Sequence, residues 1–116
     1  MLIKLTEAQC RAAMIQKDFG PDILGSEPSV AIALTQSWCP QWLWMKAWLP
    51  RAADLPGLGV YWVEYDREDF HESFMEFKEN TYGNREIPYI RYYRNGEFLR
   101  DSNFIDKSAF LRILGR

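Results

Sequence analysis

The sequence has few of the residues that build metal sites and disulfide frameworks. Among its 116 residues it has two cysteines, Cys10 and Cys39, and one histidine, His71. Two cysteines are too few for a disulfide scaffold, and neither belongs to a paired metal-ligand pattern. A single histidine adds too little for a zinc site. We therefore expect no metal and no resident cofactor.

Long apolar runs and an excess of one charge are also missing. Fourteen basic and sixteen acidic residues are interspersed and leave a net charge of −2, which predicts no nucleic-acid partner and no anchor on an anionic membrane. No stretch approaches the roughly 20 apolar residues of a membrane span, and the start MLIKLTEAQC has no leader pattern. We expect a cytoplasmic protein that forms a single domain over residues 1–116, since this length suits one core.

Several segments have the pattern of β-strands. VAIALT (30–35) and VYWVEY (60–65) are continuous apolar runs of strand length, which is typical of strands covered on both faces. Residues 2–5 predict a short extended segment at the start. Asn95-Gly96 predicts a hairpin between residues 88–94 and 97–101. These strands indicate an α/β fold with helices on both sides of the sheet.

Four helices are expected between and after these strands. Thr6 and Gln9 have the spacing of a capping box for a helix through about Lys17. A strongly apolar helix begins at Pro40, and Pro50 should kink or end it. The other two begin with candidate caps, Asp66 or Asp69 for a helix containing Phe70, Phe74 and Phe77, and Asp106 for a closing helix with Phe110, Leu111 and Leu114.

Four motifs, in order, resemble the thioredoxin family over essentially the whole chain: IKLTEAQ, WCPQW, VEYD and REIPYIRYYRNGEF. The resemblance implies a thioredoxin fold, with a central mixed four- to five-stranded sheet flanked by helices on both faces. It also implies a cis peptide bond before Pro88, beside the WCPQW corner. The backbone of Ile87 would then pair with an extended substrate segment.

The sequence departs from this family at residues that carry its usual reaction. The CxxC motif becomes Cys39-Pro40-Gln41-Trp42, so the second, resolving thiol is absent. Ala33 and Trp62 stand where the family has a buried carboxylate and its lysine, and Asn103 stands where a glycine is usual. A dithiol cycle within one chain cannot run on this motif. Glutaredoxin-type signatures before the hairpin and before the last helix are also missing.

Cys39 is the candidate catalytic residue. At a strand-to-helix corner it would lie in the N-cap region, where unpaired amides and the helix dipole favour a thiolate. Pro40 suits the first helical turn, and Gln41 either offers a donor or is simply solvated. A mixed disulfide at Cys39 would need an external thiol, such as glutathione, to release its partner. Cys10, beside Ala13 and Met14, is expected to be packed and inert.

Tryptophans surround the candidate thiol. We expect Trp44 and Trp48 to be core residues, and at least one of Trp38 and Trp42 to be exposed as a contact for a partner, with Trp42 preferred. Arg91 on a central strand either meets Glu64 across the sheet or extends its stem to solvent. The expected substrate-binding residues are Trp38, Pro40, Gln41, Trp42, Ile87 and Pro88.

Three hypotheses of function remain open at this point. The leading one is a monothiol protein in which Cys39 exchanges with protein or small-molecule disulfides and thiols. The second is a thioredoxin-like binding module that uses the Pro88 groove and the tryptophan-rich surface without turnover. The third is storage or sensing through reversible glutathionylation of Cys39. The sequence leaves the oligomeric state open.

Overall fold

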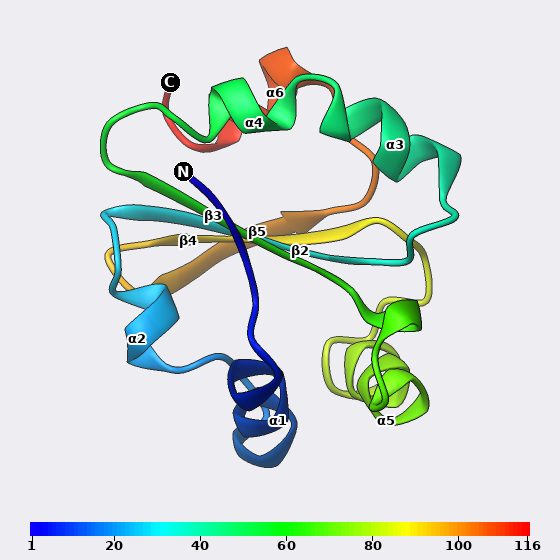
Figure 1. Ribbon diagram of the computed structural model, residues 1–116. Helices are drawn as coiled ribbons and strands as arrows, with labels where there is room; N and C mark the ends of the chain where they lie inside the picture. The colour runs from blue at the N-terminus through cyan, green and yellow to red at the C-terminus, as the bar shows by residue number, and fades with distance from the viewer.

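A five-stranded mixed sheet forms the middle layer of the computed structural model, which describes residues 1–116 (Figure 1). Its strand order is β1-β3-β2-β4-β5. β1, β3 and β2 run parallel, whereas β4 and β5 are antiparallel to their neighbours. The strands are β1 (Leu2–Lys4), β2 (Ser29–Thr35), β3 (Leu58–Glu64), β4 (Tyr89–Arg94) and β5 (Glu97–Ser102).

Helices cover both faces of the sheet (Figure 1). On one face lie α1 (Glu7–Gln16), α2 (Pro21–Leu24) and α5 (His71–Glu76), the last continued by a π-helical segment, η2 (Phe77–Thr81). On the other lie α3 (Pro40–Lys46), α4 (Leu49–Ala52) and α6 (Lys107–Ile113). A short 3-10 turn, η1 (Tyr65–Arg67), follows β3. The predicted α/β architecture with helices on both faces is confirmed, and no helix combines the length and apolar character needed to cross a bilayer.

Local signals account for several element boundaries. Thr6 accepts a hydrogen bond from the Gln9 backbone, and the Gln9 side chain accepts one from the Thr6 backbone, so the predicted capping box is present. Asp106 caps α6 through the Ala109 amide. In the β4–β5 hairpin both turn residues, Asn95 and Gly96, have positive φ, the conformation that a tight two-residue turn requires.

The helix after β3 begins differently from the prediction. Its N-cap is Phe70, and no side chain caps it, so neither Asp66 nor Asp69 has the expected role. The apolar helix that follows β2 ends at Lys46, and Pro50 lies in the first turn of the separate α4. Proline is tolerated there because first-turn amides have no intrahelical acceptor.

Arg91 and Glu64 lie on opposite faces of the sheet, so a contact between them, the first of the two alternatives, is absent. Arg91 projects toward the α1/α5 face, where the hydroxyls of its flanking residues Tyr89 and Tyr93 accept its hydrogen bonds at 2.8 Å. Its guanidinium packs between the rings of Tyr82 and Phe98, with centroids 3.8 and 4.1 Å away. Arg91 is therefore buried in an aromatic and hydroxyl environment and does not extend to solvent.

Candidate functional site

Cys39 lies at the strand-to-helix corner that the sequence predicts. It is the N-cap of α3, with φ −69° and ψ 117°, and Pro40 is the first helical residue. The Cys39 carbonyl accepts the first hydrogen bond of the helix from the Leu43 amide, at 3.1 Å. The Cys39 amide bonds back to the Gln36 carbonyl at 3.3 Å, which makes the turn between β2 and α3 tight.

The segment before β4 lies against this corner. The Ile87–Pro88 peptide bond is cis, and the Cys39 thiol donates to the Ile87 carbonyl with an Sγ···O distance of 3.7 Å. The two segments are 48 residues apart in the chain. Pairing of β2 with β4, which places Leu34 opposite Tyr89, brings them together.

Access to the sulfur is narrow. Cys39 is 4% exposed, and Pro88 is buried, whereas Ile87 is partly exposed and Pro40 and Gln41 are exposed. The surface hollows, of about 260, 240 and 380 Å³, lie between α1 and α5, between α1 and α2, and beside the hairpin turn at Asn95, none of them at Cys39. The thiol therefore meets solvent only at the edge of the corner.

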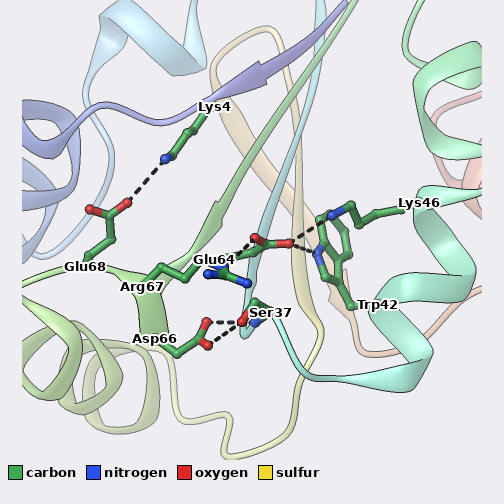
Figure 2. A network of polar contacts seen from close by, with 8 residues as sticks. All are labelled: Lys4, Ser37, Trp42, Lys46, Glu64, Asp66, Arg67 and Glu68. Atoms are coloured by element: carbon green, nitrogen blue, oxygen red, sulfur yellow. Dashed lines mark hydrogen bonds and ion pairs between the residues drawn. The ribbon is translucent and has the colours of Figure 1, made fainter.

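Asp66 holds the loop that leads to Cys39 (Figure 2). Its carboxylate accepts hydrogen bonds from the Ser37 amide at 2.7 Å and from the Ser37 hydroxyl at 2.5 Å. Burial raises the pKa of Asp66, but the hydrogen bonds from Ser37, together with a backbone hydrogen bond at Asp66 and the charge of Arg67, hold the pKa below its ordinary value. In the sequence Asp66 is recognisable only as one of two candidate helix caps, because Ser37 lies 29 residues away and no local pattern joins the two.

Trp42 is buried, and the expectation that it forms an exposed partner contact was wrong. Only 1% of it is exposed, and its indole N–H donates to Glu64 at 2.8 Å (Figure 2). Lys46 reaches the same carboxylate at 3.1 Å, and Arg67 lies 3.7 Å from its other oxygen. The position where the resemblance places a second thiol thus carries an anchored indole. The role of Glu64 had no signal in the sequence.

Trp38 and Trp44 are the exposed indoles at this end of the molecule. Each is 63% exposed. Trp38 donates its indole N–H to the Gln36 side chain at 2.7 Å, and Trp44 packs edge-on against Phe104, with ring centroids 6.1 Å apart. The expectation that Trp44 is a core residue was wrong, whereas Trp48 is partly buried and packs against Phe110.

The exposure of Trp44 follows from the rotation of α3. Trp42 and Met45 turn toward the sheet and pack in its core. Because successive residues are about 100° apart around a helix, Trp44 lies nearly opposite Trp42. Trp38, Leu43, Trp44 and Phe104 are the exposed large apolar residues around α3, and we call them the α3 apolar surface.

Asn103 occupies the space next to Pro88. Its side-chain amide donates to the Pro88 carbonyl and to the Asn84 side chain, each at 3.0 Å. Asn84 returns a hydrogen bond to the Asn103 oxygen at 3.1 Å. The paired amides join the loop before β4 to the loop before α6, so the carbonyl of Pro88 already has an intramolecular donor. The Asn84 partner was not predicted.

Cys10 is the second free thiol, and the prediction that it is packed and unpaired is confirmed. It lies within the core between the sheet and α1. Burial raises the pKa of Cys10 to about 12, and the nearby carboxylates of Glu68 and Glu7 contribute to the rise. A thiol with this pKa has almost no thiolate at neutral pH. Across the chain, no three His, Cys, Asp or Glu side chains form a metal-binding cluster.

Comparisons with known proteins agree with this architecture. No protein-family model and no curated protein sequence matches the chain. Among solved structures, thioredoxin O1 of Arabidopsis thaliana is similar with a TM-score of 0.68 and 11% identity, over 98% of this chain and 95% of that one. A mutant thioredoxin from Halobacterium salinarum has a TM-score of 0.66 and 14% identity, over 97% and 85%. The oxidised thioredoxin of Plasmodium falciparum has a TM-score of 0.66 and 12% identity, over 99% and 96%.

These similarities establish the fold. The chain has the thioredoxin fold over nearly its full length. Because the identities are only 11 to 14%, the similarity shows the fold alone, and the chemistry has to be inferred from the residues of this chain.

Proposed function

We propose that this protein exchanges thiols and disulfides through the single cysteine Cys39. The observation that carries the proposal is the position of its sulfur: at the N-cap of α3 and 3.7 Å from the Ile87 carbonyl. First-turn amides without intrahelical acceptors favour an anion at such a corner. The physiological partners would be protein or small-molecule disulfides and thiols in the cytoplasm, where thiols are kept reduced.

The reaction would proceed in two balanced steps. The Cys39 thiolate attacks one sulfur of a disulfide R–S–S–R′, forms a Cys39–S–S–R bond and releases R′–S⁻, which takes up a proton. Trp42 replaces the thiol that would otherwise attack this bond from within. A second thiolate, from glutathione or another small thiol, then attacks the R sulfur, forms its own disulfide with R and releases the Cys39 thiolate.

Substrate contacts would come from both sides of the sulfur. The Ile87 amide has no hydrogen-bond partner within the protein, so an extended partner segment can accept from it. Trp38 and the exposed residues Pro40 and Gln41 would border that segment. Trp42 would contribute indirectly, because its buried indole fills the space beneath the Cys39 corner.

A second candidate function is supported by the burial of the thiol. With Cys39 only 4% exposed, the corner can serve as a structural element of a binding module. The α3 apolar surface would then make the contact with a partner, without any turnover. Stable glutathionylation of Cys39 is the third candidate, because it needs only the first of the two steps.

Mixed-disulfide formation separates these functions. We expect oxidised glutathione to add one glutathione to Cys39, seen by peptide mass spectrometry, in the wild type and in Cys10→Ala but not in Cys39→Ser. Reduction of a disulfide substrate should then require reduced glutathione. A Cys39 that forms the adduct without turnover would identify storage or sensing. If Cys39 forms no adduct in the folded protein, the binding module remains as the candidate function.

A further inference from the structure

Lys78 is a charged residue of η2 that is fully buried. None of the ion pairs in the protein includes its ammonium group. The group donates a hydrogen bond to the Asn84 carbonyl at 2.8 Å and lies 5.9 Å from the centre of the Tyr89 ring. Because burying a charge costs free energy unless polar contacts compensate it, Lys78 and the Asn84 backbone hold each other in place.

The Asn84 side chain connects this anchor to the residue that follows β5. Its Oδ1 atom accepts from the Glu86 amide and from Nδ2 of Asn103, each at 3.0 Å. Its Nδ2 atom donates to Oδ1 of Asn103 at 3.1 Å. The two side chains therefore bond to each other in both directions, and neither amide group can flip without losing bonds. We call Asn84 and Asn103 the amide pair.

The amide pair determines which side of the segment before β4 the Pro88 carbonyl faces. Asn103, which follows β5, donates to this carbonyl at 3.0 Å. The carbonyl of the preceding residue, Ile87, faces the other way, because it accepts from the Cys39 thiol in the loop after β2. β2 and β5 flank β4 on its two sides. Holding the Pro88 carbonyl toward Asn103 therefore keeps the Ile87 carbonyl toward Cys39.

Ile87 is the residue whose backbone a partner segment can reach. It is partly exposed, and its amide has no hydrogen-bond partner within the protein. Its carbonyl is released when Cys39 ionises, since a thiolate has no hydrogen to donate. In strand addition the receiving residue exchanges both its amide and its carbonyl with the partner. Groups that already face the bound direction save the free energy of ordering them during binding.

We propose that Asn103, fixed by Asn84, is a positioning residue for partner docking. By holding the Pro88 carbonyl toward β5, it keeps the amide and carbonyl of Ile87 aimed at an extended peptide beside Cys39. The inference rests on the proposed exchange function of Cys39. It names the substrate class that this arrangement favours, an extended peptide or protein disulfide, because a disulfide without amides cannot form these bonds.

Two disulfides of 2-mercaptoethanol test the inference in a Cys10→Ala background. One is its symmetric disulfide, which has no amide, and the other is its mixed disulfide with the cysteine of a short extended peptide. The Cys39 thiolate attacks the peptide sulfur, forms a Cys39–S–S–peptide bond and releases 2-mercaptoethanol thiolate, which takes up a proton. Intact-mass analysis of quenched samples gives the second-order rate constant for each adduct.

The expected result is a change in the ratio of the peptide rate constant to the small-disulfide rate constant. Asn103→Ala and Asn84→Ala should each lower this ratio about fivefold, the effect of one net hydrogen bond. The rate constant for the small disulfide should stay the same. Asn80→Ala, the same substitution at an exposed position of η2, is the matched control and should leave the ratio unchanged.

N-methylated peptides provide a readout that needs no variant at the amide pair. In a series with a methyl group on each backbone amide in turn, one peptide should lose its bond to the Ile87 carbonyl and react about fivefold more slowly. Asn103→Ala should not distinguish this peptide from the unmethylated one. A merely structural role of Asn103 would lower the melting temperature and leave the discrimination intact.

Several outcomes would overturn the inference. They are an unchanged ratio in Asn103→Ala, equal reaction of all methylated peptides with the unsubstituted amide pair, and an equal loss for both disulfides, which would assign the effect to the thiol itself. A lower ratio in Asn103→Ala with no change in Asn84→Ala would also do so, because the pair would not act together. The proposed function is judged separately: a protein with the amide pair intact that forms no adduct with either disulfide would overturn that function and this inference together.

Discussion

The indole N–H of Trp42 donates to the carboxylate of Glu64 at 2.8 Å, between α3 and the end of β3. This bond fixes the inward side of α3 at its first turn, just after Cys39. It also places a large, satisfied side chain where the thioredoxin resemblance would put a second thiol. At this corner Cys39 is therefore the only thiol, and the place of a second one is filled by a packed indole.

Trp42→Phe should lower the free energy of unfolding by about 1–3 kcal/mol, because Glu64 loses a donor in a buried position. Urea unfolding followed by circular dichroism measures the change. Trp44→Phe is the matched control on the exposed side of the same helix, and its effect should stay within about 0.5 kcal/mol. Equal effects of the two substitutions would contradict the assigned burial.

Trp42→Cys should convert the corner to a dithiol. After treatment with oxidised glutathione, the Cys39 adduct should be short-lived and an internal disulfide should replace it, because the new thiol can attack the mixed disulfide. Intact-mass analysis distinguishes the two products. The change also removes a buried indole at a cost of about 3–5 kcal/mol, so Trp42→Ala, with a similar cavity and no thiol, is the control. A lasting adduct in a folded Trp42→Cys variant would contradict the proposed geometry.

Asp66→Asn should weaken the protein in a pH-dependent way. The folded pKa of Asp66 is lowered, so its carboxylate contributes stability above the unfolded value of about 3.9, and this contribution is lost as the pH falls through the folded pKa. Urea unfolding should show a larger gap between wild type and variant at pH 7 than at pH 3. Asp69→Asn, at an exposed carboxylate, should show no such gap. A gap that is independent of pH would argue against the charged interaction with Ser37.

The two cysteines should react at very different rates. Burial raises the pKa of Cys10 to about 12, so iodoacetamide should leave Cys10 unmodified at pH 8 in the folded protein and modify it in urea. Cys39, at the edge of the corner, should react first. Peptide mass spectrometry after timed quenching measures both rates in one sample. Faster labelling of Cys10 under native conditions would contradict its packing in the core.

Elements that depend on neighbouring residues could be predicted from the sequence. The capping box of Thr6 and Gln9, the Asn95-Gly96 turn and the Asp106 cap each join residues within three positions of one another. The apolar runs of β2 and β3 also indicated buried strands, because each pattern lies within one short segment of the chain. The place of Cys39 at a strand-to-helix corner followed from these local patterns.

The orientation of α3 shows where local patterns stop being sufficient. The sequence contained two apolar stripes on this helix, one through Trp42, Met45 and Leu49 and one through Trp44 and Trp48. Both have helical spacing, so periodicity alone could not tell which one faces the sheet. The prediction of a buried Trp44 and an exposed Trp42 is the reverse of the structure.

The sequence by itself determined the order of the five strands and of α1, α3, α5 and α6, the turn chemistry and the presence of one thiol without a resolving partner, whereas the short helices α2 and α4 were not predicted. The tertiary structure alone decided that Glu64 receives Trp42, that Asp66 holds Ser37, that Asn103 pairs with Asn84 and that Thr35 is left without a partner. The physical reason is distance along the chain. The bonded partners are 19 to 29 residues apart, and only the register of the assembled sheet brings them within bonding reach.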